Sequence, residues 1–189
     1  PFSQSMNISG EDLTLEMWLN PSSTEAFRRD ISGKGGGPYF ILNNAGTAAE
    51  AGRIGFQIYA FDDTTTSSVI SYFTLPVNTW THIAGTYNKS IMKLYINGVL
   101  DNSTPTTITS LSGNSNGYEI GSTPNDLFFN GKIDEFAMWN ASISADKIAE
   151  HAGAKVLDYS IYGNNGTRNF NSTSDFGRNF TDGKFSKAL

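Results

Sequence analysis

The chain has 189 residues, no cysteine, 13% aromatic residues and only 16% charged residues, with a net charge of −5. This length predicts one domain that can bury a core without disulfides. The net negative charge argues against a basic stripe that could bind nucleic acid. No apolar run approaches the roughly 18 residues of a membrane span. We therefore expect neither nucleic-acid binding nor insertion into a membrane. Because the chain starts at Pro1, we interpret it as a processed or excised product.

Short alternating segments separated by turn residues follow one another along most of the chain. In Leu13–Asn20, apolar residues alternate with Thr14, Glu16 and Trp18, which is typical of a strand with one face in a core. The expected strands are Phe2–Ser9, Leu13–Asn20, Arg28–Ser32, Tyr39–Asn43, Arg53–Ala60, Val69–Phe73, Trp80–Tyr87, Met92–Ile96, Val99–Asn102, Thr106–Thr109, Tyr118–Gly121 and Gly131–Trp139, with a polar loop at Asp62–Ser68.

The central hairpin is expected from Trp80–Tyr87 and Met92–Ile96, with Asn88–Ser90 as its turn. Both faces of the first strand carry apolar residues, which indicates a strand in the middle of a packed sheet. The dipeptide Asn97-Gly98 favours a type I′ turn, because both central residues of that turn need positive φ.

One short helix is expected, at about Ser144–His151. Ser144 is a suitable N-cap and Asp146 complements the helix dipole. A dozen short strands with one helix near 144–151 predict an all-β fold, a two-sheet antiparallel β-sandwich of the jelly-roll type.

Six segments follow one another along the chain in a characteristic order and spacing, namely Leu13–Pro21, Thr79–Tyr87, Leu94–Gly98, Tyr118–Gly121, Phe129–Asn140 and Ile143–Ile148. Together they resemble the laminin G-like, concanavalin A-like jelly-roll family. The resemblance implies a non-catalytic sandwich of secreted or cell-surface proteins, which binds carbohydrate or protein or acts as a spacer. It also implies that one structural calcium ion is common among relatives.

The C-terminal part departs from the family pattern. Residues Leu157–Thr167 resemble the beginning of such a domain, so the order looks circularly permuted. We expect a body at 1–155 and a terminal segment at 156–189. That segment contains Phe170, Phe176, Phe180 and Phe185, and each exposed phenylalanine forfeits roughly 1.5–3 kcal/mol relative to burial. The segment could pack on its own body, add a strand to a neighbouring subunit and build a filament, or reflect one period cut from an array.

A catalytic constellation is not evident. The adjacent pair Asp134-Glu135 should point to opposite faces of a strand, whereas a glycosidase needs two carboxylates that flank one bond. We expect His82 to be a hydrogen-bonded core or intersheet residue and His151 to lie near the helix C-terminus. The chain is therefore predicted not to be an enzyme.

Structural calcium is the one cofactor that the sequence suggests. Asp158 and Asn164 lie in an oxygen-rich stretch, and Asp134 could join them. The alternative is that Asp158 and Asn164 form turns and Asp134 accepts a backbone amide. Asp62-Asp63 is a lesser candidate, expected to be a solvated loop. For carbohydrate, the aromatic residues near loops are Tyr59, Phe61, Tyr72 and Phe128, although core packing is the stronger explanation for each.

N-glycosylation triplets occur seven times, at Asn7, Asn88, Asn102, Asn140, Asn165, Asn171 and Asn179. With the other observations they favour an extracellular or cell-surface structural module. It would be a repeating subunit of an array or filament, joined through its terminal strands to copies of itself or to adjacent like domains. The alternative function is a carbohydrate-binding or adhesive module of a secreted or surface protein, with glycans as partners.

Overall fold

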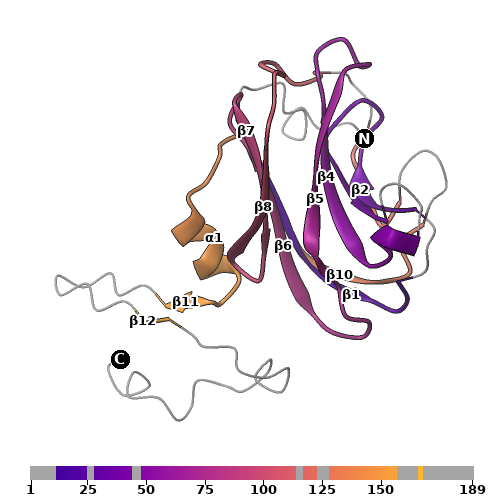
Figure 1. Ribbon diagram of the computed structural model, residues 1–189, viewed down its shortest axis with the longest axis vertical. Helices are drawn as coiled ribbons and strands as arrows, with labels where there is room; N and C mark the ends of the chain where they lie inside the picture. Colours follow the sequence, from indigo (N-terminus) through magenta and orange to yellow (C-terminus); the bar gives the residue numbers. More distant parts are fainter. Residues whose placement is uncertain are drawn as a thin grey trace.

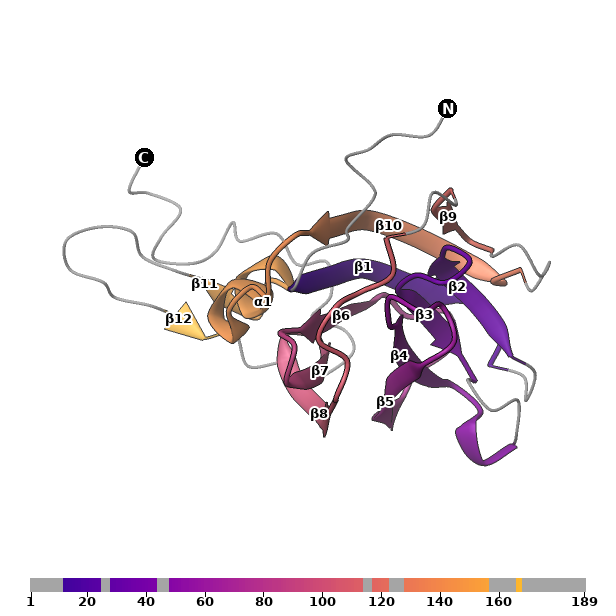
Figure 2. The same ribbon diagram turned by 90° about the horizontal axis from the view of Figure 1, so that it is seen from above.

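The computed structural model describes residues 12–24, 28–43, 48–113, 117–122, 128–156 and 166–167. Within them the strands form two five-stranded sheets that face each other, as the views in Figures 1 and 2 show. The first has the order β10-β1-β6-β7-β8 and the second β5-β4-β3-β2-β9, with antiparallel neighbours throughout. The predicted two-sheet antiparallel sandwich is confirmed.

The elements follow one another closely in the sequence. The strands of the sandwich are β1 (Leu13–Pro21), β2 (Arg29–Gly33), β3 (Tyr39–Leu42), β4 (Arg53–Tyr59), β5 (Thr66–Thr74), β6 (Thr81–Tyr87), β7 (Ile91–Ile96), β8 (Val99–Pro105), β9 (Glu119–Ile120) and β10 (Gly131–Trp139). A short 3-10 helix at Ala48–Glu50, the helix α1 (Ala145–His151) and the strand pair β11 (Lys155–Val156) and β12 (Gly166–Thr167) complete the described residues. None of these elements is a helix long and apolar enough to cross a membrane.

The core lies between the facing sheets and is made by the alternating apolar residues of each strand. Leu13, Leu15, Met17 and Leu19 of β1 are fully buried in it, as their spacing predicts. The Phe40 and Phe56 rings of the second sheet pack with centroids 5.4 Å apart. Gly85 of β6 lies against Phe56, where a Cβ would come within 2.5 Å of the ring, so a glycine is needed for the sheets to approach.

The two sheets are also joined along the edge formed by β5 and β8, which run side by side (Figure 1). The Asp101 carboxylate of β8 accepts the backbone N–H groups of Tyr72 and Phe73 at 2.7 and 3.1 Å. The side-chain amide of Asn102 donates to the Ile70 carbonyl at 2.8 Å. Side chains of β8 thus satisfy backbone groups of β5 that would otherwise form an open sheet edge.

The outer face of the first sheet is covered by the chain that leaves β10 and by α1 (Figure 2). Ser144 is the N-cap, and its side chain accepts the Lys147 N–H, as predicted. Asn97 and Gly98 have φ angles of 49° and 80°, which confirms the type I′ turn. A Cβ at Gly98 would lie 2.8 Å from Ala149, so this turn is the surface on which α1 packs.

Three details differ from the sequence predictions. Thr106–Thr109 is not a strand; the segment runs irregularly, with Ile108 in the core and the Ile108 carbonyl accepting the Tyr87 hydroxyl. The predicted loop Asp62–Ser68 is partly wrong, because β5 begins at Thr66 and pairs there with Tyr59. A bulge in β10 places Glu135 at φ 49°, so Ile133 lies on the core side together with Phe136 and Met138 rather than opposite them. The expected strand Phe2–Ser9 lies outside the described residues.

Candidate functional site

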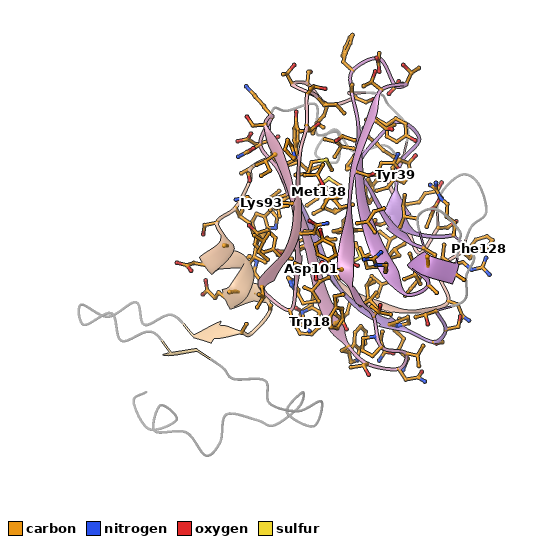
Figure 3. All side chains as sticks on the ribbon, in the orientation of Figure 1. Trp18, Tyr39, Lys93, Asp101, Phe128 and Met138 are labelled. Carbon is orange, nitrogen blue, oxygen red and sulfur yellow. The ribbon has the colours of Figure 1, made fainter. Side chains whose placement is uncertain are left out.

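The aromatic residues proposed for carbohydrate occupy separate parts of the molecule. Tyr59 is half-buried, with its ring 5.7 Å from that of Tyr39, and so it serves packing. Phe61, Tyr72 and Phe128 are 78%, 70% and 61% exposed. Phe61 follows β4, Tyr72 lies on β5 beside Asp101, and Phe128 precedes β10 on the far side of the sandwich from Lys93 (Figure 3). The structure therefore does not bring these aromatics into a single site.

Phe61 stands at a groove of about 260 Å³ between two loops. One wall is the β4–β5 turn and the other is the irregular segment 107–110. The lining residues are Ala60, Phe61, Asp62, Thr65, Thr107, Ile108, Thr109 and Ser110. The Phe61 N–H donates to the Ser110 carbonyl at 3.1 Å, and Ala60 forms a β-bridge with Leu111, so the two walls are held in fixed register.

Asp62 organises the turn that carries Phe61. Its Oδ1 accepts the N–H groups of Thr64 and Thr65 at 2.9 and 2.7 Å, and its Oδ2 accepts the Thr65 hydroxyl at 2.6 Å. The hydroxyl and backbone hydrogen bonds of Thr65, followed by that of Thr64, lower the pKa of Asp62 to about 2. Asp62 is therefore ionised at neutral pH and acts only as a hydrogen-bond acceptor.

Asp63, the residue after Asp62, is the second carboxylate of this turn. Asp63 accepts a short hydrogen bond from the Ser112 hydroxyl. Lys34 is almost fully buried nearby; burial lowers the pKa of its ammonium, and the charge of Asp63 acts in the opposite direction. The loop acids predicted as a lesser calcium candidate are thus both engaged in local contacts.

The groove combines an exposed aromatic face with hydroxyl groups and one carboxylate. Thr107, Thr109 and Ser110 are exposed, so their hydroxyls are open to a ligand. Such a set can stack against the apolar face of a sugar ring while donating and accepting hydrogen bonds around its edge.

A polar cluster centred on two buried side chains, Glu16 and His82, occupies the outer face of the first sheet, beside the chain that leads to α1. We call Glu16, Trp18, His82, Trp139 and His151 the Glu16 cluster. Glu16 is 4% exposed, and its Oε1 accepts the Trp139 indole N–H at 2.9 Å and contacts His151 Nδ1 at 2.8 Å. The Trp139 ring stacks on that of His151, and Trp18 meets His82 edge-on. The cluster ties β1, β6, β10 and α1 together.

Two polar atoms of this cluster, Glu16 Oε2 and His82 Nδ1, have no hydrogen-bond partner among the described residues. Burial, and then the nearby His151, lower the pKa of His82 to about 4. His82 is therefore neutral at pH 7, and its Nε2, 3.6 Å from Glu16 Oε2, is not part of an ion pair under those conditions. His82 is buried, as expected, but it lies on the outer face rather than between the sheets, and its ring makes no hydrogen bond with the described residues, contrary to the prediction.

Of the three residues predicted to bind calcium, Asp134 is the one that lies in the part of the chain that the structure describes, so the predicted site stays a prediction. Asp134 is exposed, and its Oδ1 accepts the neighbouring Glu135 N–H at 2.8 Å, which was the alternative reading of this side chain. Asp158 and Asn164 lie outside the described residues. No group of three acidic or histidine side chains within the described ranges could hold a metal ion. The bulge also leaves both Asp134 and Glu135 exposed, contrary to the simple alternation expected from a regular strand.

The glycosylation triplets differ in accessibility. Asn88 and Asn140 are exposed, and Asn88 Oδ1 accepts the Ile91 N–H at 3.1 Å. Asn102 is half-buried and its amide nitrogen is engaged with Ile70. The other predicted positions, Asn7, Asn165, Asn171 and Asn179, lie outside the described residues, as do the four phenylalanines of the terminal segment, Phe170, Phe176, Phe180 and Phe185.

Two sets of residues were missed from the sequence. The groove wall at 107–110 overlaps the expected strand Thr106–Thr109, and the polar alternation of that segment gave no sign of an irregular path. The alternation placed Glu16 only on the face of its strand opposite the core residues. A carboxylate flanked on that face by Thr14 and Trp18, rather than by charged residues, was the available signal that this face is covered.

Comparison with known proteins identifies one family and several solved structures with a similar fold. The laminin G family model, described as the concanavalin A-like lectin/glucanases superfamily, matches residues 2–149. Adhesion G-protein coupled receptor D1 of Homo sapiens is 31% identical over 130 residues, which are 66% of this chain and 15% of the receptor. The chain thus spans a small part of that relative.

Two solved structures illustrate the fold. Domain 4 of an extracellular family GH43 arabinanase from Geobacillus stearothermophilus, in complex with arabinotriose, has a TM-score of 0.62 at 18% identity, over 77% of this chain and 68% of that one. The binding domain of botulinum neurotoxin serotype G has a TM-score of 0.61 at 13% identity, over 80% of this chain and 38% of that one. At these identities the likeness concerns the fold.

Proposed function

Because this chain belongs to the laminin G-like family of concanavalin A-like lectin and glucanase domains, we propose that it is a carbohydrate-binding or adhesive module that holds a neutral saccharide in the groove beside Phe61. The observation that carries the proposal is the 78% exposure of Phe61 at the rim of a groove lined by hydroxyl groups. A large apolar ring in water has a cost that binding of a sugar face would offset. The carbohydrate ligand of the arabinanase domain and the adhesion receptor relative are consistent with this role.

The groove supports binding rather than hydrolysis. Glycosidases need two carboxyl groups at the scissile bond, one of which is protonated. Asp62 is the one carboxylate that lines the groove among the described residues, and its pKa of about 2 unsuits it as a general acid at neutral pH. Glu16, the other unusual carboxylate, is sealed under Trp139 and His151. We therefore propose a non-catalytic role.

The test is a glycan array followed by calorimetric titration, with arabinotriose among the neutral probes. Phe61→Ala should weaken binding by about tenfold to a hundredfold, because covering an exposed phenylalanine ring is worth up to roughly 1.5–3 kcal/mol, the value for full burial of the side chain. Phe128→Ala removes another exposed ring, which is 61% exposed and lies elsewhere on the molecule, and should leave binding unchanged. If Phe61→Ala binds the glycan as tightly as the natural protein does, the groove is not the binding site. If the natural protein binds no glycan, the proposed function is wrong.

We also propose, as a separate and finer role, that the module joins copies of itself or adjacent like domains through the segment 156–189. The four phenylalanines of that segment support docking against an apolar surface. The full chain should then form oligomers in light scattering, and Phe176→Ser with Phe180→Ser should return it to a monomer. A compact monomer with or without calcium would contradict assembly. Loss of oligomers in chelator would support a metal ion at the joint, for which Asp134, Asp158 and Asn164 are the proposed calcium ligands.

We propose an extracellular location, which the adhesion receptor relative supports. In that setting the exposed Asn88 and Asn140 are the better glycan acceptors, because the atom that carries an N-linked glycan in Asn102 is engaged between the sheets. Mass spectrometry of the secreted protein should find glycans on Asn88 or Asn140 and none on Asn102. A glycan found on Asn102 alone would contradict this assignment.

A further inference from the structure

A second groove, of about 220 Å³, lies on the outer face of the first sheet. It runs between β6 and β7 on one side and the segment 142–145, which leads into α1, on the other. Figure 3 places Lys93 between β7 and that segment. Thr86 and Tyr95 are buried at its floor, and Asn88, Lys93, Ser142 and Ser144 stand around them. Its lining is therefore dominated by hydroxyl and amide groups.

Lys93 is the one charged residue that lines this groove among the described residues. It pairs with Thr86 across the β6–β7 ladder, which places its side chain beside that hydroxyl on the outer face. It forms no ion pair with any acid in the described ranges; the nearby Lys147 and Glu150 of α1 instead pair with each other at 2.8 Å. Half-buried Lys93 thus brings an unbalanced positive charge to a polar cavity.

The hydroxyl groups around Lys93 are able to donate hydrogen bonds. Burial raises the pKa of Tyr95, so its phenol stays neutral, and the Thr86 hydroxyl opposes this shift by a smaller amount. The Ser144 oxygen accepts the Lys147 N–H at 3.2 Å, which leaves its own proton free to point into the groove. An ammonium and several neutral donors around one cavity complement an anionic oxygen group, since charge-assisted hydrogen bonds are about twice as strong as neutral ones.

We propose that this groove binds an anionic oxygen group, and that its preferred ligand is the carboxylate of an acidic sugar. The small volume and the hydroxyl groups of the lining suit a monosaccharide unit. A neutral sugar would leave the charge of the Lys93 ammonium unpaired, whereas a carboxylate would pair with it. The site is distinct from the Phe61 groove, which has the opposite charge at its rim and lies at the β4–β5 turn.

The experiment is a titration of the isotope-labelled full chain, followed by amide chemical shifts. Sodium glucuronate and glucose form a matched pair of probes that differ at the carboxylate, and sodium sulfate tests a free inorganic anion. Glucuronate should cause saturable shifts at Thr86, Tyr95 and 142–145, whereas glucose should cause none there. If sulfate binds as tightly as glucuronate, the anion site stands and the preference for a sugar is overturned.

Two matched variants test the role of the ammonium. Lys93→Gln should weaken glucuronate binding by about tenfold or more, while Lys132→Gln, which removes an exposed lysine on β10, should not change it. Unchanged binding by Lys93→Gln, equal binding of glucose, or the absence of saturable shifts in this groove would each overturn the proposal. None of these outcomes depends on whether the Phe61 groove binds a neutral saccharide.

Discussion

The two faces of the sheet β10-β1-β6-β7-β8 are held by different forces. On the inner face, Leu15 and Ile83 pack with Phe56 of the opposite sheet and contribute through buried apolar area. On the outer face of the same strands, Glu16 and His82 are equally buried but lie in a polar cluster under α1. Burial alone therefore does not define the core of this protein. We expect the inner face to tolerate changes of side-chain shape poorly and the outer face to tolerate changes of charge poorly.

The largest expected effect is on the inner face. Phe56→Ala should lower the free energy of unfolding by about 3–5 kcal/mol, because it leaves a cavity beside Phe40 and Gly85. Denaturant unfolding measures the change, which should be the same at pH 7 and pH 5. Phe128→Ala, at an exposed ring, is the control and should stay within about 0.5 kcal/mol. A loss below about 1 kcal/mol for Phe56→Ala would show that the sheets do not meet there.

The outer face should respond to pH instead. The folded pKa of His82 is about 4, below its ordinary value of 6.5, so the folded state resists its protonation. The stability that depends on neutral His82 is complete above pH 6.5 and is lost as the pH falls toward 4. The loss is at most about 3 kcal/mol from this group.

His82→Gln isolates this contribution from that of the other titrating groups. Unfolding curves of the two proteins between pH 8 and 4 should diverge below pH 6.5, with the natural protein losing more stability than the variant. Curves that stay parallel over this range would contradict a buried, neutral His82.

A smaller and more local effect is expected for Trp139→Phe. The variant keeps an aromatic ring but removes the indole N–H from Glu16 Oε1, and loss of one partner of a buried hydrogen bond costs about 1–3 kcal/mol. Hydrogen exchange should accelerate at α1 and leave the amides of β3 unchanged. Equal acceleration in both places would mean that the Glu16 cluster stabilises the whole sandwich rather than the docking of α1.

The smallest effect is expected for Thr14→Val. The Thr14 hydroxyl donates to the Ala141 carbonyl at 2.6 Å and accepts the Ile143 N–H at 3.0 Å, so the variant should cost about 1–2 kcal/mol. Thr66→Val, at an exposed end of β5, should be nearly neutral and is the matched control. If both variants behave alike in thermal unfolding, the hydroxyl does not fix the chain between β10 and α1.

The parts of the fold that could be predicted are those that local sequence patterns determine. Alternation identified β1 and β6, and Asn97-Gly98 identified a turn, because each depends on neighbours within a few residues. The bulge at Glu135 depends on how β10 meets β1, and the path of Thr106–Thr109 depends on Ile108 entering the core, so neither has a local signature.

The sites were less predictable for the same reason. Phe61 was among the aromatic candidates, but its partners at 107–110 arrive from a segment with no pattern of its own. Glu16 meets Trp139 and His151 across more than a hundred residues, and nothing near Glu16 in the sequence marks them. Lys93 is an ordinary polar residue of an alternating strand until the chain before α1 closes a groove over it.

The most direct test of the central claim is a map of the bound saccharide on the natural protein. Amide chemical shifts should be recorded during titration with the neutral oligosaccharide that binds best on the array, starting with arabinotriose. We expect saturable shifts at 60–65 and 107–110, which form the walls of the Phe61 groove. Shifts confined to another surface, or none at saturating concentrations, would contradict the account of this module as a carbohydrate binder through that groove.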